Sequence, residues 1–188
     1  MQRVTGIEQR ISEYLPAEVR VWRCRGEDAS AGARRLLQPA LRWLGLTMLA
    51  RRPIRGAQVD HSLTHAGDCA YALAVRAPGV IGVGIDYEPW RALDARHARL
   101  MLTRREQQQL PAAGSRDWLR IWTVKEACYK ADRDGQQRWV TAYELVQPSR
   151  RHGTARILQG NRYHFFRYLS LEVPGGLLSI AFKMEFPQ

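Results

Sequence analysis

Two acidic motifs, at 84–88 and 122–130, carry the side chains best suited to chemistry. The first, GIDYE, closes an apolar run and places Asp86 and Glu88 two residues apart. If the run is a strand, both carboxylates point to the same face. They repel each other unless a cation lies between them, and Mg²⁺ prefers a few carboxylates, waters and phosphate oxygens. The alternative is a pair of solvated charges in a strand-to-helix loop.

The second motif, WTVKEACYK, lies in a helical pattern. Trp122, Glu126 and Lys130 follow at i, i+4 spacing and therefore share one helix face. The tryptophan indicates partial burial of that face, and a buried glutamate and lysine need partners. One interpretation makes Glu126 a third metal ligand and places Lys130 on a phosphate. The other is a surface ion pair between them, which contributes about 0.2–0.5 kcal/mol.

Together the motifs resemble the signature of the 4'-phosphopantetheinyl transferase superfamily, Gly-Ile/Val-Asp-x-Glu followed by Trp-Ser/Thr-x-Lys-Glu-Ala/Ser-x-x-Lys. Every defining position is filled here. The resemblance implies that Asp86, Glu88 and Glu126 bind Mg²⁺, or Mn²⁺, which holds the pyrophosphate of coenzyme A. It also implies that Lys125 and Lys130 contact coenzyme A phosphates. Glu126 and Lys130 are therefore expected to act in catalysis, Lys130 by offsetting charge on the leaving 3',5'-ADP.

Two further stretches extend the resemblance. SLTHAG at 62–67 is similar to the family's Ser-x-Ser-His-Ser/Ala-Gly, which implies that His65 contacts a coenzyme A phosphate. The alternatives are a structural histidine and a zinc site shared with His61. LTRRE at 102–106 is similar to Phe-Ser/Thr-x-x-Glu, which makes Glu106 a candidate general base. A helix capping box starting at Thr103 explains Glu106 equally well without chemistry.

The resemblance covers about residues 60–146 and is weak before them. Longer relatives grip coenzyme A with basic residues near the N-terminus and a Gly-Lys-Pro stretch. Neither aligns here, and we expect the basic residues of the loop at 51–56 to replace them, namely Arg51, Arg52 and Arg55. After Lys130 the chain has DRDGQQ at 132–137, where relatives often show Gly-x-Gly-Leu.

Hydrophobic periodicity and turn residues predict an α+β chain, with helices clustered before a mostly antiparallel sheet. Expected strands cover 19–23, 69–75, 80–87, 139–146, 155–158, 163–171 and 177–182. Expected helices cover 30–50, capped by Ser30 and bent or interrupted at Pro39, then 91–101, one from Thr103, and 116–131.

The resemblance implies a more specific fold of two α+β lobes related by an approximate two-fold axis. Each lobe would be an antiparallel sheet packed with helices, with coenzyme A in the cleft between them. We expect an N-terminal lobe at 1–78 and a C-terminal lobe at 79–188 that carries the metal and coenzyme A motifs. Because each lobe supplies half of the cleft, this form predicts a monomer.

Net charge is the strongest compositional signal. Lys and Arg total 29 against 18 Asp and Glu, a formal charge of +11, which attracts polyanions. Coenzyme A and an acidic carrier protein both fit this charge. Nucleic acid fits less well, because clustered carboxylates would repel phosphates and the aromatic residues do not interleave with the basic ones.

Cysteine usage and hydropathy indicate a reducing compartment and no membrane. Three scattered cysteines, Cys24, Cys69 and Cys128, predict buried reduced thiols rather than disulfides. No stretch approaches the roughly 20 apolar residues of a membrane span, and the N-terminus lacks a secretory signal pattern. We therefore expect a cytoplasmic protein.

The expected reaction is Mg²⁺-dependent transfer of 4'-phosphopantetheine from coenzyme A to a serine of an acidic apo acyl or peptidyl carrier protein. Two alternatives stay open at this point. One is a catalytically silent relative that binds coenzyme A or a carrier protein. The other is a basic nucleic-acid-binding protein.

Overall fold

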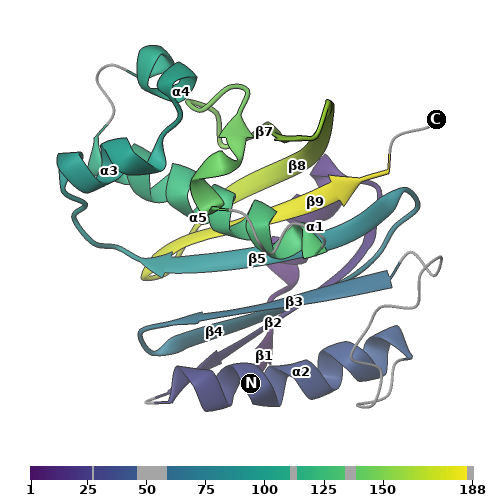
Figure 1. Cartoon of the computed structure of the whole chain (residues 1–188). Coiled ribbons are helices and arrows are strands. Elements are labelled where there is room, and N and C mark those ends of the chain that lie inside the picture. The colour runs from purple at the N-terminus through teal and green to yellow at the C-terminus, as the bar shows by residue number, and fades with distance from the viewer. Residues whose placement is uncertain (27, 46–58, 111–113, 134–138, 186–188) are drawn as a thin grey trace.

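Two antiparallel sheets and the helices that cover them make up the protein (Figure 1). The computed structural model describes residues 1–26, 28–45, 59–110, 114–133 and 139–185. The first sheet has the strand order β1-β2-β4-β3, antiparallel throughout. The elements of this half are β1 (Gln2–Arg3), α1 (Thr5–Tyr14), β2 (Glu18–Arg25), α2 (Ala29–Leu44), β3 (Val59–Ala66) and β4 (Cys69–Arg76).

The second sheet has the order β5-β9-β8-β7-β6 and is also antiparallel. Its half of the chain contains β5 (Val80–Pro89), α3 (Ala95–Met101), α4 (Arg104–Gln109), α5 (Ser115–Ala131), the 3-10 helix η2 (Val140–Ala142), β6 (Glu144–Leu145), β7 (His152–Gln159), β8 (Arg162–Val173) and β9 (Gly176–Met184). The expected α+β class with two antiparallel sheets is confirmed. The expected division after residue 78 falls in the turn between β4 and β5, and as a lobe boundary it stays a prediction.

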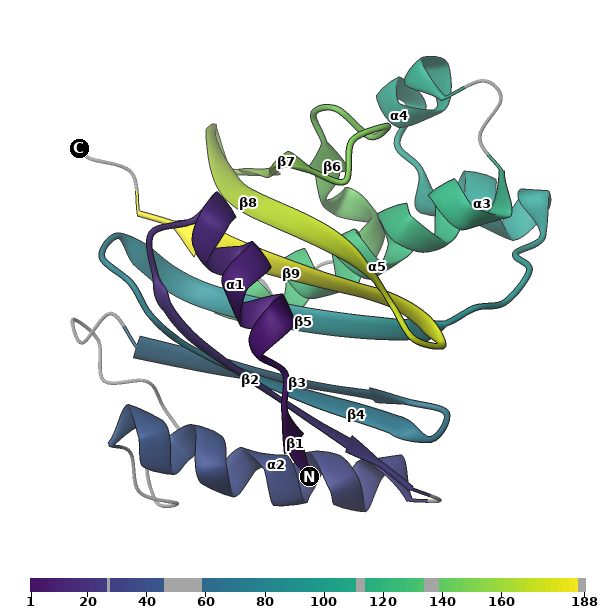
Figure 2. The same cartoon turned by 180° about the vertical axis from the view of Figure 1, so that it is seen from behind.

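Three hydrophobic clusters join these elements in layers. One cluster lies between the two sheets and includes residues of α1. A second lies between α5 and the opposite face of the second sheet, and a third lies between α2 and the first sheet. Figure 2 shows α1 lying across the second sheet on the face that α5 does not cover. Both faces of the second sheet are therefore buried.

Three elements are missing from the sequence-based prediction, namely the two-residue β1, α1 and β3. In β3 the buried residues Asp60, Ser62 and Thr64 are polar, so no alternation of hydrophobic residues indicates a strand. In α1 the buried apolar residues are only Ile7 and Ile11, which is too few for a clear helical stripe.

Helix α2 differs from its predicted form at its start. The side chain of Asp28 accepts from Ala31 N at 2.7 Å, so Asp28 caps the helix and Ser30 does not. The helix continues through Pro39 to Leu44 without interruption. It ends there because Gly45 caps it in the left-handed conformation, so the expected end near residue 50 is wrong.

Three later predictions have different outcomes. The stretch 139–146 is not one strand, because it forms η2 and the two-residue β6, and Trp139 is 84% exposed. Helix α3 starts at 95 rather than 91, because Asp94 caps it. The capping box is confirmed, since the side chains of Thr103 and Glu106 each accept from the other's backbone N–H.

The two sheets meet where the edge strand β3 lies along the edge strand β5. Three side chains of β3 accept hydrogen bonds from backbone N–H groups of β5, and both series of residues rise together, so the strands run parallel. The pairs are Asp60 with Val83 at 2.8 Å, Ser62 with Ile85 at 3.1 Å, and Thr64 with Tyr87 at 3.2 Å. Side chains thus satisfy N–H groups that an edge strand would otherwise leave unpaired.

Buried polar contacts hold helix α5 in place at three positions along its length. Near its start, Arg120 donates to backbone carbonyls of the segment after β6, including that of Arg150 at 2.8 Å. In its middle, Lys125 pairs with Glu106 of α4 at 2.7 Å, and both side chains are fully buried. Just after its end, Asp132 accepts from Lys183 of β9 at 2.6 Å. These contacts fix the helix against the sheet.

Two expectations from composition concern the burial of the cysteines and membrane-spanning helices. All three cysteines are free; Cys69 and Cys128 are buried, but Cys24 is only half-buried, which corrects the expectation that all three are buried. In the part of the chain that the structure describes, no helix combines the length and apolar character needed to cross a membrane.

Lys125→Ala should lower the free energy of unfolding by about 3–5 kcal/mol, because it leaves the carboxylate of Glu106 buried without its cation. Urea denaturation at neutral pH measures this loss. The matched control is Arg162→Ala at an exposed position of β8, which should change stability by no more than about 0.5 kcal/mol. Equal, small effects in both variants would contradict the assigned role of the pair.

Candidate functional site

Two glycines of β5 allow α5 to lie directly on the strand. A Cβ atom at Gly82 would lie 2.1 Å from the carbonyl oxygen of Ala131, and one at Gly84 would lie 1.9 Å from that of Ala127. Both distances are far below van der Waals contact, so only glycine permits this approach. Gly84 of the GIDYE motif therefore brings the WTVKEACYK helix against the strand that carries the acids.

The side chains of Asp86 and Glu88 both face α5, as their spacing predicts. Lys130 Nζ donates to Asp86 Oδ1 at 2.7 Å, and Trp122 Nε1 donates to Glu88 Oε1 at 3.2 Å. Arg91 Nε also donates to Glu88 Oε2, at 3.3 Å. The structure therefore brings the two motifs together, with Lys130 paired to the strand acid.

Asp86 is the most enclosed acid of the cluster, at 6% exposure. Its Oδ1 accepts from Lys130 and from Thr64 Oγ1, the latter at 3.3 Å. Its Oδ2 is buried and has no hydrogen-bond partner among the described residues. Burial raises the pKa of Asp86, and the ammonium of Lys130 offsets part of this. An unsatisfied buried acceptor costs about 1–3 kcal/mol, a cost that a cation at Oδ2 would remove.

Glu126 lies one helical turn before Lys130 and is half-buried. Its pKa is raised first by burial and then by the charge of Asp86, with a smaller contribution from Glu88, while Lys130 acts in the opposite direction. Three carboxylates thus lie close enough to repel one another, with one lysine among them. Such a cluster favours binding of a divalent cation.

The three acids do not form a complete metal site as they stand. Within the described ranges, no three His, Cys, Asp or Glu side chains converge closely enough to hold a metal ion. Glu88 is turned toward Trp122 and Arg91. Since Mg²⁺ keeps several waters and uses only one or two protein carboxylates, Asp86 and Glu126 fit its requirements, and Glu88 needs a side-chain rotation to join them.

Lys125 and Glu106 lie elsewhere, which corrects their expected positions. The two side chains pair with each other at 2.7 Å in the interior, and both are fully buried. Glu106 also accepts from the backbone N–H groups of Thr103 and Leu145. Burial lowers the pKa of Lys125. In this arrangement neither side chain is accessible to a phosphate or to a substrate hydroxyl, because the interactions that cap α4 and anchor α5 enclose them.

The two candidate histidines, His61 and His65, both lie in β3. His65 is exposed, and its neighbour Thr64 contacts Asp86. His61 is half-buried, and burial lowers its pKa. The described residues contain no metal-ligand group that includes both histidines. The expected coenzyme A ligands Arg51, Arg52 and Arg55 lie outside the described residues.

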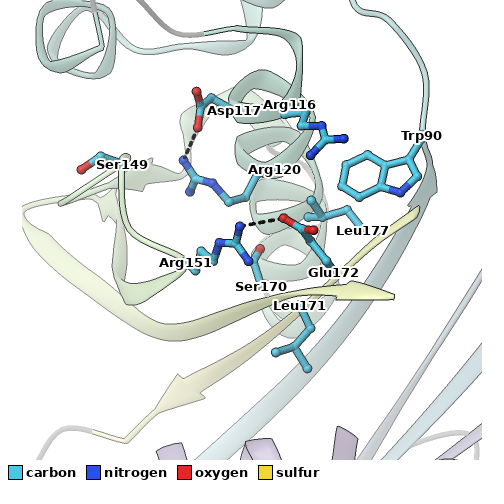
Figure 3. Close-up of a pocket in the computed structure, with 10 residues that line it drawn as sticks. All are labelled: Trp90, Arg116, Asp117, Arg120, Ser149, Arg151, Ser170, Leu171, Glu172 and Leu177. Atoms are coloured by element: carbon cyan, nitrogen blue, oxygen red, sulfur yellow. Dashed lines mark hydrogen bonds and ion pairs between the residues drawn. The ribbon is translucent and has the colours of Figure 1, made fainter. Parts of the chain in front are cut away.

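A separate pocket of about 290 Å³ lies at the start of α5, against β8 and β9 (Figure 3). Three arginines line it, but Arg120 donates to Asp117 and Arg151 pairs with Glu172. Arg116 stacks on the ring of Trp90, 5.1 Å from its centroid. Since two of the three arginines already have carboxylate partners, we assign no phosphate to this pocket.

Sequence reasoning missed the polar residues of β3 that link the sheets. Asp60, Ser62 and Thr64 precede His65 at alternate positions, and this alternation of short polar side chains was the available signal. Arg133, in the stretch that departs from the family pattern, pairs with Asp60 and strengthens the same junction.

A family model described as the 4'-phosphopantetheinyl transferase superfamily matches residues 82–181, which is more than half of the 188 residues. The match begins in the strand that carries Asp86, includes α5 and ends in β9. No curated protein matches the chain.

Gly84→Ala should cost at least about 1–3 kcal/mol of stability, because the new methyl group collides with the backbone of α5. Gly6→Ala in α1 is the matched control, since a Cβ there meets nothing within 4 Å. It should be neutral or should stabilise by up to about 1 kcal/mol. Urea denaturation compares them, and a tolerated Gly84→Ala would contradict the close approach of α5.

Glu126→Gln should stabilise the metal-free protein at pH 8. A carboxyl with a raised pKa binds its proton more tightly in the folded state, so its contribution to stability falls as the pH rises through the interval from its unfolded pKa, about 4.3, to its folded pKa. The variant lacks this loss, and its advantage should vanish below about pH 4. Denaturation with a chelator present checks this, and a less stable variant at pH 8 would refute it.

Proposed function

Because the chain belongs to the 4'-phosphopantetheinyl transferase superfamily, we propose that it transfers 4'-phosphopantetheine from coenzyme A to a serine of an acidic apo carrier protein, with Mg²⁺ bound. The family supports phosphopantetheine transfer in general. The observation that carries the specific proposal is the buried Asp86, whose Oδ2 lacks a partner among the described residues, beside Glu126 and Lys130.

Asp86 and Glu126 would hold the cation, joined by Glu88 after a rotation of its side chain. When bound, Mg²⁺, or Mn²⁺ in its place, polarises the pyrophosphate of coenzyme A and offsets its charge. Lys130 neutralises Asp86 in the free protein, at 2.7 Å. It is available to a phosphate oxygen once a cation takes over that role, because its side chain is 29% exposed.

In the transfer, the serine oxygen bonds to the β-phosphorus of coenzyme A and the bond from that phosphorus to 3',5'-ADP breaks. The serine proton passes to a carboxylate. We place this role at Glu126 rather than Glu106, because Glu126 is half-buried beside the acidic cluster, whereas Glu106 is fully enclosed by Lys125 and two backbone N–H groups. Positioning and electrostatics then lower most of the barrier.

The coenzyme A phosphates would also contact the first half of the chain. His65 is exposed in β3, and we assign its imidazole to a coenzyme A phosphate on the family resemblance. Arg51, Arg52 and Arg55 precede β3 in sequence and supply three more cations for the same polyanion. Lys125 is left out of this set, because its ammonium is committed to Glu106.

We place the acidic carrier protein on the exposed basic residues that follow the acid-bearing strand in the chain. Arg96 and Arg99 of α3 and Arg104 of α4 are exposed, as is Leu100 at 77%. These residues follow the acid-bearing strand directly in the chain. Opposite charges favour docking of an acidic partner and make it sensitive to salt.

Asp86→Asn should lower the rate of phosphopantetheine transfer at least about 100-fold, because loss of a metal ligand removes several kcal/mol of charge stabilisation. Mass spectrometry of apo acyl and peptidyl carriers, incubated with coenzyme A and Mg²⁺, measures the transfer. Asp68→Asn, an exposed acid in the β3–β4 turn, is the matched control and should keep wild-type activity.

Wild-type activity in Asp86→Asn would remove the metal assignment. If the wild-type protein modifies no carrier but still binds coenzyme A, the chain is the catalytically silent relative instead. The fully buried Lys125, which departs from the expected phosphate contact, is the observation that favours this second candidate.

A further inference from the structure

The hydroxyl of Thr64 connects the junction between the sheets to the acidic cluster. Its oxygen accepts from Tyr87 N at 3.2 Å, in the same way that Ser62 accepts from Ile85 N at 3.1 Å. Because the oxygen serves as acceptor there, its own proton is available, and it donates to Asp86 Oδ1 at 3.3 Å. Both groups are buried, with Thr64 at 4% exposure.

Both hydrogen bonds to Asp86 end on the same oxygen. Lys130, on α5, donates from Nζ to Oδ1 at 2.7 Å. Thr64, on the neighbouring strand β3, donates from Oγ1 to the same oxygen. Two donors from different elements fix the rotation of the carboxylate group. Oδ2, without a hydrogen-bond partner among the described residues, then points its lone pairs in one direction.

We infer that Thr64 is a positioning residue, whose hydroxyl holds Asp86 so that Oδ2 is presented to the divalent cation. This inference rests on the proposed function, because it takes the cation site as given. A hydrogen-bonded partner behind a ligating carboxylate sets its orientation, and its loss weakens metal binding about 10- to 100-fold. Thr64 orients the carboxylate from the first sheet, whereas Asp86 lies in the second sheet.

The chain offers a matched set of variants for this residue. Thr64→Val keeps the shape but removes the hydroxyl, and therefore removes both the acceptor for Tyr87 N and the donor to Asp86. Ser62→Ala removes the equivalent acceptor for Ile85 N without touching Asp86. Thr64→Ser keeps the hydroxyl. The difference between the first two variants isolates the contact with Asp86 from the contact between strands.

The measurement is the affinity for Mn²⁺ in the presence of saturating coenzyme A, from the electron paramagnetic resonance signal of free Mn²⁺. Thermal melts accompany it to show that each variant is folded. Thr64→Val should weaken Mn²⁺ binding about 10- to 100-fold. Ser62→Ala and Thr64→Ser should bind like the wild type.

Other patterns overturn the inference. Unchanged Mn²⁺ affinity in Thr64→Val shows that the hydroxyl does not position Asp86. Equal weakening in Thr64→Val and Ser62→Ala shows an effect of the junction alone, and weakening in Thr64→Ser shows an effect of the methyl group. Absence of Mn²⁺ binding by the wild type would instead overturn the proposed function, and the inference with it.

Discussion

The parallel pairing of β3 with β5 is the constraint on which the rest of the structure depends. β5 is an edge strand, and the N–H groups of Val83, Ile85 and Tyr87 meet side chains rather than a neighbouring backbone. The two sheets therefore keep separate ladders while they share one hydrophobic core. The same contacts fix the register of the two strands, so Thr64 arrives beside Asp86.

On the other side of β5, two glycines of the strand and two buried ion pairs set the position of α5. Glycines at 82 and 84 remove the steric barrier, while Lys125–Glu106 and Asp132–Lys183 hold the helix at its middle and just after its end. Buried ion pairs often add little net stability, because desolvation offsets their attraction, but breaking one is costly. Here they act as fixed points that keep Glu126 within electrostatic reach of Asp86.

Local geometry explains how much of this was predictable from the sequence. Alternation placed Asp86 and Glu88 on one face of a strand, and i, i+4 spacing placed Glu126 and Lys130 on one face of a helix. Only the family resemblance implied that these faces come together, and in the structure they do meet. The burial of Lys125 was not predictable, because it depends on how α4 packs on α5. The alternating polar residues of β3, including Thr64, were visible in the sequence, but their burial was not predictable, because only a partner strand far along the chain makes polar burial favourable.

We propose that Asp86 and Glu126 bind one divalent cation, which in turn binds the pyrophosphate of coenzyme A. A crystal structure of the protein grown with coenzyme A and Mn²⁺ tests it most directly, because the anomalous signal of manganese locates the ion. We expect a single strong peak for an ion bonded to Asp86 Oδ2 and to a pyrophosphate oxygen, with Glu126 among its ligands. A bound coenzyme A with no peak at these carboxylates, or with the metal bound elsewhere, would contradict it.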